Sequence, residues 1–124
     1  MATFGTKIQN LRKTRRLTQR QLAERVAARL KEKDRRGFDF TYLSKIENER
    51  MGPPSVPAIM ALAAELDVDS DELLALAGKA PPDLGEKLKE SAAARQFYRS
   101  ALDMNLSDDD WEQMLRRLRE RKEQ

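Results

Sequence analysis

The side chains with the clearest chemical potential are the basic ones near the beginning of the chain. Residues 1–50 contain 14 Lys and Arg against 6 Asp and Glu, residues 51–80 contain 1 against 5, and residues 81–124 contain 9 against 10. The net charge of the whole chain is only +3, so the positive charge is concentrated in the first fifty residues. Such a distribution is typical of a module that binds a polyanion, and a charged face exposed to solvent is the alternative interpretation.

Most catalytic chemistry is excluded by composition, because the chain contains no Cys and no His. This composition rules out disulfides, thiolate or imidazole metal sites, Cys nucleophiles and His bases. Carboxylates can act as acid and base or hold Mg²⁺, but the run Asp108–Asp110 suits the N-terminus of a helix. We expect a protein that is not an enzyme and has no cofactor and no metal site.

The 124 residues form one domain, or a small domain with an appendage. Hydrophobic residues make up 40% and charged residues 36%, which predicts a modest core under a heavily charged surface. No apolar run approaches the roughly 18 residues of a membrane span, and the first residues lack the apolar stretch of a secretion signal. We therefore expect a cytoplasmic protein without membrane contact.

Apolar residues spaced by three and four predict helices throughout, so the expected fold class is all-α. A first helix is expected over about residues 4–15. Four more helices follow candidate N-caps at Thr18, Asp39, Ser55 and Ser70. Thr18 forms a capping box with Gln21, and Gly78 ends the fifth helix. Five short helices thus fill residues 4–78.

A second helical region follows Pro81 and Pro82. Its first part is expected to be one bent helix or two, and its last helix begins with a capping box of Ser107 and Asp110. Four apolar residues of this last helix recur at the spacing of a single face: Trp111, Met114, Leu115 and Leu118. This face needs a partner, inside or outside the chain.

Several segments of the first 78 residues carry a more specific signal. They read Leu17-Thr18-Gln19-x-x-Leu22-Ala23-x-x-Val26, Phe40-Thr41-Tyr42-Leu43-Ser44-Lys45-Ile46-Glu47-Asn48, Pro54-Ser55, Leu62-Ala63-x-x-Leu66-x-Val68 and Leu73-Leu74. In this order they closely resemble the Cro/C1-type, or XRE-type, helix-turn-helix family of prokaryotic and phage transcriptional regulators. The resemblance implies a five-helix lambda-repressor-like DNA-binding domain over residues 1–80. The helical appendage over residues 81–124 lies outside the resemblance and is expected from its apolar spacing alone.

The resemblance also implies that the helix at about residues 39–48 is a recognition helix, which enters the major groove of double-stranded DNA. It places Phe40, Thr41 and Lys45 at base-facing positions, with Ser44 on the neighbouring face. A Thr methyl suits thymine, and a Lys amine suits guanine O6 and N7. Phe40 has two readings, contact with a thymine methyl or an inward position against the preceding segment.

A second group of residues is expected to contact phosphates, which supply affinity without sequence information. The group comprises Lys7, Arg12, Arg16, Gln19, Arg20 and Tyr42. Two of them have an alternative role, because Gln19 can orient the recognition helix and Tyr42 can cover helix two. Glu47 is expected to be structural and to pair with a basic neighbour such as Arg12, since a carboxylate repels phosphate.

The chain departs from the family's pattern in two places. Residues 27–36 are an insertion of ten residues that is expected to extend helix two to about Lys33. Four of its five basic residues are expected to form either an extra arm that contacts phosphates or a solvated protrusion: Arg29, Lys33, Arg35 and Arg36. Glu49 stands where the family often has glycine, so either Asn48 adopts the left-handed conformation or the helix runs on into Arg50.

These features predict a sequence-specific DNA-binding transcriptional regulator, a homodimeric repressor that reads an inverted repeat. Dimerisation is assigned to residues 81–124 through Phe97, Trp111, Met114, Leu115 and Leu118. Packing of this region within the chain and capture of another protein are the alternatives. The contrasting function is a protein-binding adaptor or antitoxin-like module that uses the last helix to recruit a regulator or toxin.

Overall fold

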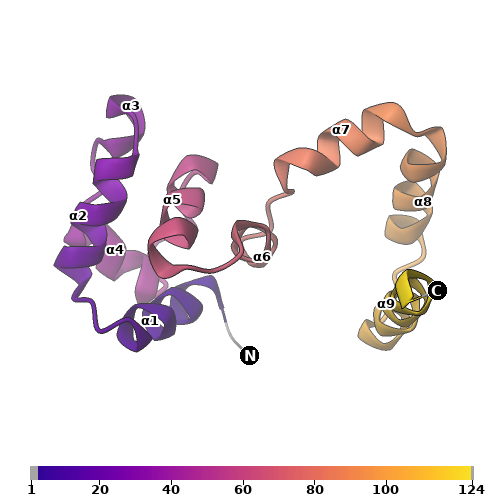
Figure 1. The fold of residues 1–124 in the computed structure, drawn as a ribbon, viewed down its shortest axis with the longest axis horizontal. Coiled ribbons are helices and arrows are strands. Elements are labelled where there is room, and N and C mark those ends of the chain that lie inside the picture. The colour runs from indigo at the N-terminus through magenta and orange to yellow at the C-terminus, as the bar shows by residue number, and fades with distance from the viewer. Residues whose placement is uncertain (1–2, 124) are drawn as a thin grey trace. The chain divides into compact units, whose positions relative to one another are not determined.

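The computed structural model of the chain describes residues 3–123. These residues form nine helices and no strand, which confirms the all-α prediction (Figure 1). The chain divides into two compact units, the N-terminal unit ending at Pro81 and the C-terminal unit beginning at Pro82.

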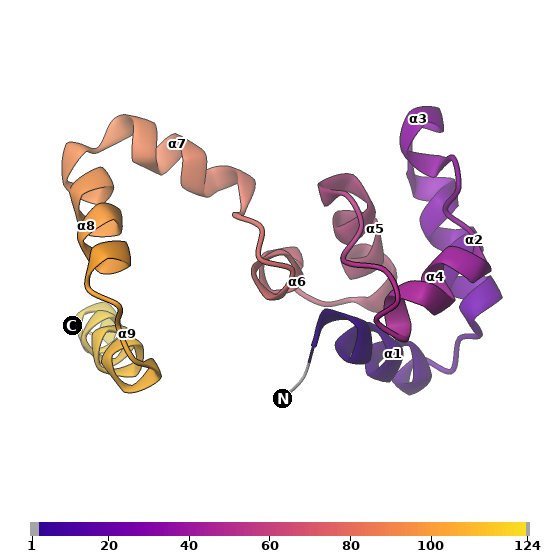
Figure 2. The ribbon, with the colours of Figure 1, turned by 180° about the vertical axis from the view of Figure 1, so that it is seen from behind.

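The N-terminal unit contains six helices, one more than the sequence predicts. They are α1 (Phe4–Thr14), α2 (Gln19–Arg29), α3 (Glu32–Arg35), α4 (Phe40–Glu47), α5 (Val56–Leu66) and α6 (Ser70–Leu76). The additional helix is α3, a single turn within the insertion. Figure 2 shows α4 crossing α2, and α4 also packs against α1.

Side-chain caps define where these helices begin. Thr18 and Gln21 form the predicted reciprocal capping box, and Asp39 accepts a hydrogen bond from the Tyr42 N–H at 2.9 Å. Ser55 caps α5 as expected. The prediction for α6 was wrong by one residue, because Asp69 supplies the capping oxygen and Ser70 is the first residue inside the helix.

The core of the N-terminal unit joins apolar side chains from five helices. Leu22 and Val26 of α2 and Leu43 and Ile46 of α4 are fully buried, as predicted. Other fully buried members are Ile8, Ile59, Leu62, Leu66, Leu73 and Leu74. Gly5 marks the closest approach, because a Cβ at this position would lie 2.3 Å from the Ile46 carbonyl oxygen. The first turn of α1 therefore rests directly on the end of α4.

The insertion is anchored in the core, and its helix boundaries differ from the prediction. α2 ends at Arg29 rather than about Lys33, because Leu30 adopts an extended conformation that turns its side chain into the core. Gly37, with φ +80°, then reverses the chain, and Phe38 returns to the core. The helical spacing from Val26 to Leu30 suggested a continuous helix, but both ends of the insertion are held by apolar burial.

The exit from α4 also differs from both predicted alternatives. α4 ends at Glu47, Asn48 has φ −91°, and Glu49 itself adopts the left-handed conformation with φ +63°. The Arg50 N–H closes the turn by donating to the Lys45 carbonyl at 2.8 Å. The Thr3 hydroxyl donates to the Glu49 carboxylate, which ties this turn to the start of α1.

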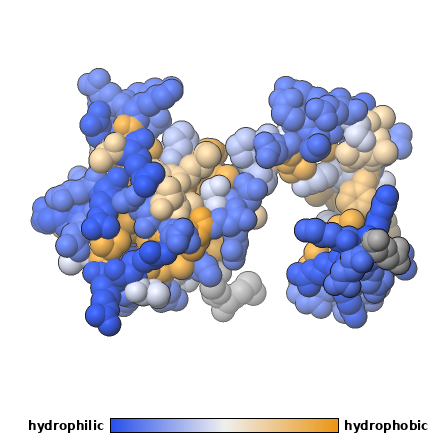
Figure 3. All heavy atoms as spheres, viewed as in Figure 1, coloured by the Kyte–Doolittle hydropathy of each residue, from blue (hydrophilic) through white to orange (hydrophobic). Residues whose placement is uncertain are grey.

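The C-terminal unit consists of α7 (Pro82–Glu90), α8 (Ala92–Asp103) and α9 (Asp108–Glu123). Two helices therefore precede the last one, and the capping box of Ser107 and Asp110 is present with bonds of 3.0 and 3.1 Å. Among the described residues of this unit, Ala101 is the only buried hydrophobic one. Large apolar side chains of α8 and α9 remain exposed, and Figure 3 shows apolar atoms at the surface over α8.

No helix within residues 3–123 combines the length and the apolar character that crossing a membrane requires.

Candidate nucleic-acid interface

The outward side of α4 gathers the three residues predicted to face bases, together with the neighbouring Ser44. Phe40, Thr41 and Lys45 are exposed and Ser44 is partly buried. Their spacing along the helix puts all four on one face, because Leu43 and Ile46 point the opposite face into the core. The helix thus presents one aromatic, two hydroxyl and one cationic side chain to solvent.

A buried ion pair holds this helix in position. The Arg12 Nε and Nη2 atoms donate to the two carboxylate oxygens of Glu47 at 2.8 and 2.9 Å, as the expected pairing required. The Glu47 side chain is fully buried and that of Arg12 is 11% exposed. A two-point contact between guanidinium and carboxylate fixes orientation as well as distance. The pair therefore joins the last turn of α1 to the last residue of α4.

Two further contacts extend this pair to the start of α2. The remaining terminal nitrogen of Arg12, Nη1, donates to the Leu17 carbonyl at 2.9 Å, just before α2 begins. Gln19 Nε2 donates to Glu47 at 3.2 Å, so the amide points toward the buried carboxylate. The geometry thus favours the orienting role for Gln19. The Arg12 guanidinium, which was predicted to contact a phosphate, is instead bonded to Glu47 and Leu17 within the fold.

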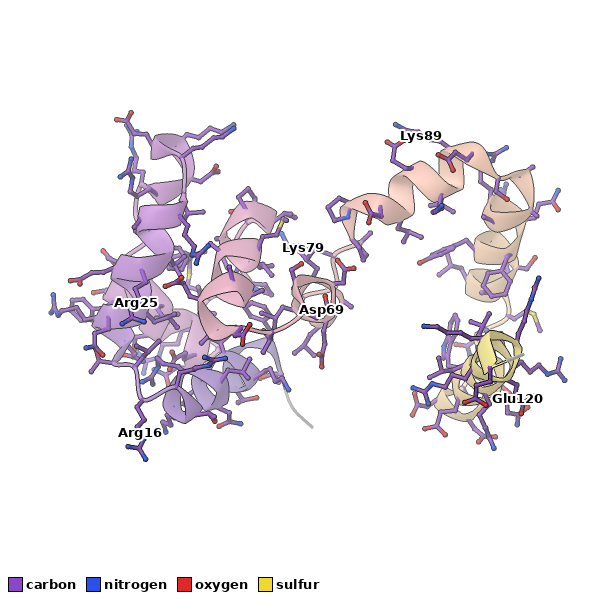
Figure 4. All side chains as sticks on the ribbon, in the orientation of Figure 1. Arg16, Arg25, Asp69, Lys79, Lys89 and Glu120 are labelled. Atoms are coloured by element: carbon purple, nitrogen blue, oxygen red, sulfur yellow. The ribbon has the colours of Figure 1, made fainter. Side chains whose placement is uncertain are left out.

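The other predicted phosphate contacts lie around the start of α2. Arg16 adopts φ +57° in the turn between α1 and α2, and its side chain extends away from the unit in Figure 4. Lys7 on α1 is half-buried. Arg20 is exposed, and its guanidinium carbon lies 4.2 Å from the centroid of the Phe40 ring. The inward alternative for Phe40 is wrong, because this side chain is 40% exposed.

Tyr42 lies partly buried against the core of the N-terminal unit. Its ring meets Phe38 edge to face, with centroids 5.5 Å apart and an interplanar angle of 87°. Burial raises the pKa of the Tyr42 hydroxyl above its ordinary value, which keeps the group neutral. The sequence does not predict the burial of Phe38, because the residues before Asp39 have no helical spacing to mark an inward side chain.

The basic residues of the insertion do not act as one group. Arg29 donates to Glu65 of α5 at 2.6 Å, which directs it toward the body of the unit. Lys33, Arg35 and Arg36 are exposed. On the face seen in Figure 3, hydrophilic residues cover most of α3 and the adjoining part of α2. Three of the four cations that were predicted to contact phosphates are therefore available to a polyanion.

Comparison with known proteins adds independent information. The model of the family described as "Helix-turn-helix domain" matches residues 5–79. The uncharacterized HTH-type transcriptional regulator RghRB of Bacillus subtilis (strain 168) is 31% identical over 105 residues, which span 82% of this chain and 68% of that protein. A solved chain from a complex of the SinR and SinI proteins is similar in fold, with a TM-score of 0.50 and 24% identity over 98% of this chain and 100% of that chain.

Proposed function

The chain belongs to the XRE-type helix-turn-helix family of DNA-binding transcriptional regulators, and from this premise we propose that it is a homodimeric repressor that binds an inverted repeat. The observation that carries the proposal is the outward face of α4, which displays Thr41, Ser44 and Lys45 from a helix whose other face is locked in the core. A major groove about 12 Å wide admits one such helix.

Base contacts supply specificity in this proposal. The Lys45 amine donates to guanine O6 or N7, the Thr41 methyl packs on a thymine, and the Ser44 hydroxyl serves either hydrogen-bonding role. Arg12 and Gln19 act through Glu47, since their contacts hold the start of α2 against the end of α4. These two are positioning residues.

Phosphate contacts supply affinity, and the proposal assigns them to Lys7, Arg16 and the exposed cations of the insertion. Each neutralised phosphate releases condensed counterions. A plot of the logarithm of the binding constant against the logarithm of the salt concentration therefore has a slope of roughly −0.9 per phosphate contact. The test is a salt titration of the full chain on duplex DNA. A slope near zero would contradict the proposed contacts.

The proposed phosphate contacts of the insertion are tested by substitutions that remove positive charge and preserve the fold. Lys33→Ala together with Arg36→Ala leaves the anchoring residues Leu30 and Phe38 intact. We expect the salt slope to shrink by roughly 0.9 for each lost contact, with the base preference unchanged. Arg29→Ala is the matched control, because Arg29 is engaged by Glu65. A slope that is unchanged in the double variant would favour the solvated protrusion.

Dimerisation is proposed to use the apolar surface of the C-terminal unit. Phe97 and Leu118 are 55% and 66% exposed, and Trp111 and Leu115 are nearly half exposed. A second copy is the proposed occupant, because one recognition helix reads few base pairs and two half-sites roughly 34 Å apart multiply the affinity. Met114, on the same face, is partly buried and completes the proposed surface.

Sedimentation of the full chain tests this interface. Leu115→Lys should convert a dimer to a monomer, because it places a charge within the apolar face. Glu120→Lys is the control on the same helix (Figure 4), about 140° around the helix from Leu115. Equal masses for wild type and Leu115→Lys, whether both dimeric or both monomeric, would reject the dimerisation surface.

A second candidate function uses the same surface for another protein. The solved structure that this chain resembles in fold is a complex of two different proteins. In the C-terminal unit, a small apolar pocket lies among Phe97, Tyr98, Ala101, Leu102 and Trp111. An adaptor or antitoxin-like module would offer this pocket to a regulator or toxin. Such a protein would not bind duplex DNA in a salt-dependent manner, which separates the two candidates.

Neither candidate requires catalysis or a cofactor, and we propose that the protein is not an enzyme. Among the described residues, no three acidic side chains gather in a way that could hold a metal ion. Regulators of this prokaryotic family act on DNA in the cytoplasm, so we propose that compartment, with no role for a membrane surface.

A further inference from the structure

Arg20 and Phe40 form a stacked pair at the base-facing end of the N-terminal unit. Arg20 is the second residue of α2 and Phe40 is the first residue of α4. The guanidinium carbon lies 4.2 Å from the ring centroid, well within the roughly 6 Å of a cation–π contact. The pair therefore joins an exposed cation to the N-terminal turn of the recognition helix.

Stacking leaves the hydrogen-bonding groups of Arg20 free. The guanidinium carbon lies over the ring, and the five N–H donors of an arginine lie in the plane of its guanidinium group. No carboxylate among residues 3–123 forms an ion pair with Arg20. The Phe40 ring thus acts as a platform that orients the Arg20 side chain, and Phe40 itself remains 40% exposed.

The spacing of the pair fits two adjacent base pairs. Successive bases on one strand are about 3.4 Å apart, close to the 4.2 Å between the guanidinium and the ring. In the major groove, Arg donates two parallel bonds to guanine O6 and N7, and Phe makes apolar contact with the thymine methyl. Each group of the pair therefore has a matching partner on neighbouring bases.

We propose that Arg20 and Phe40 read one dinucleotide step as a unit, Arg20 contacting a guanine and Phe40 the methyl of the adjacent thymine. This inference rests on the proposed function. It reassigns Arg20 from phosphate contact to base contact, because the stack holds its donors beside the first turn of α4, where residues of a recognition helix reach base edges.

The test begins with duplexes selected from a random pool by the full chain. We expect each half-site to contain a guanine next to a thymine. Arg20→Ala should lower discrimination at the guanine by roughly 5- to 150-fold, and Phe40→Ala should lower it at both positions because Arg20 loses its platform. Arg25→Ala is the matched control on α2 (Figure 4), since five residues along the helix place Arg25 about 140° away from Arg20.

A second readout isolates the methyl group. Replacing the thymine by uracil removes only the methyl, and we expect binding of the wild-type chain to weaken about fourfold, the factor for one buried methyl-sized group. Phe40→Ala should be insensitive to this replacement. Equal sensitivity of wild type and Phe40→Ala would overturn the assignment of the ring.

The outcomes separate this inference from the proposed function. If Arg20→Ala weakens all duplexes equally and reduces the salt slope by about 1, Arg20 contacts a phosphate and the reading unit is refuted, while DNA binding stands. If Arg20→Ala behaves like Arg25→Ala, the reading unit is likewise refuted. If no duplex is enriched by the wild-type chain, both the inference and the proposed function fail.

Discussion

Replacing Arg12 with alanine perturbs the contact that holds α4 against α1. The substitution removes two hydrogen bonds to Glu47 and one to the Leu17 carbonyl. The Glu47 carboxylate, whose side chain is fully buried, then keeps only the 3.2 Å bond from Gln19. A buried charge without its partner is costly because water cannot replace the lost interaction.

The expected loss of stability is about 3–5 kcal/mol, the range for removing one member of a buried ion pair. For a unit of this size, each kcal/mol lowers the melting temperature by roughly 4–8 °C. Thermal unfolding of the full chain, followed by circular dichroism, should therefore show the transition of the N-terminal unit lowered by more than about 10 °C.

Arg29→Ala provides the control with the same substitution and the same change in net charge. Its partner Glu65 lies 2.6 Å away, but the Arg29 side chain is 50% exposed, so water replaces the contact. We expect a loss of about 1 kcal/mol or less. If the two variants lose the same stability, burial of the Arg12–Glu47 pair is not what holds α4 in place.

Three further predictions test the packing and the caps. Gly5→Ala should destabilise the chain by about 1–3 kcal/mol in urea unfolding, because the new methyl meets a backbone carbonyl of α4; Gly85→Ala, with open space around it, should instead be neutral or stabilising. Phe38→Ala should cost about 3–5 kcal/mol and increase hydrogen exchange in the insertion, whereas an exchange pattern like that of wild type would show that Phe38 does not anchor it. Hydrogen bonds from Ser107 lower the pKa of Asp110, so this cap stabilises α9 above the ordinary carboxyl pKa and loses its effect as pH falls through the lowered value. The helicity of the chain should therefore fall at acid pH, and Asp110→Asn should remove this fall. A helicity that depends on pH in the same way in both proteins would contradict the role of Asp110.

Local signals in the sequence predicted much of the fold. A capping box such as that of Thr18 and Gln21 depends on residues three apart, so it can be read without knowledge of the rest of the chain. The buried positions Leu43 and Ile46 follow from helical spacing in the same way. The α6 cap was misplaced because Asp69 and Ser70 are neighbouring residues with similar capping ability.

The insertion could not be predicted to the same extent. Leu30 satisfies the helical spacing from Val26, but it also reaches the core from an extended backbone. Only the positions of α4 and α5 decide whether the backbone at Leu30 is helical or extended. Glu49 is a similar case. A glutamate rarely adopts φ +63°, and it does so here where its carboxylate is bonded to Thr3, a residue 46 positions away.

The candidate site divides along the same line. The common face of Phe40, Thr41 and Lys45 follows from their spacing on one helix, and the pairing of Glu47 with Arg12 follows from the chemistry of a carboxylate beside a basic surface. The stack of Arg20 on Phe40 could not be predicted, because it joins α2 to α4. The relative position of these two helices depends on the insertion between them, which has no counterpart in the family's pattern.

Selection of bound duplexes from a random pool by the full chain reports the specificity, symmetry and spacing of DNA binding in one experiment. We expect a palindromic consensus whose half-sites are centred roughly 34 Å apart, bound with an affinity that falls steeply as salt rises. Failure to enrich any sequence, or an affinity that does not change with salt, would contradict the proposed function.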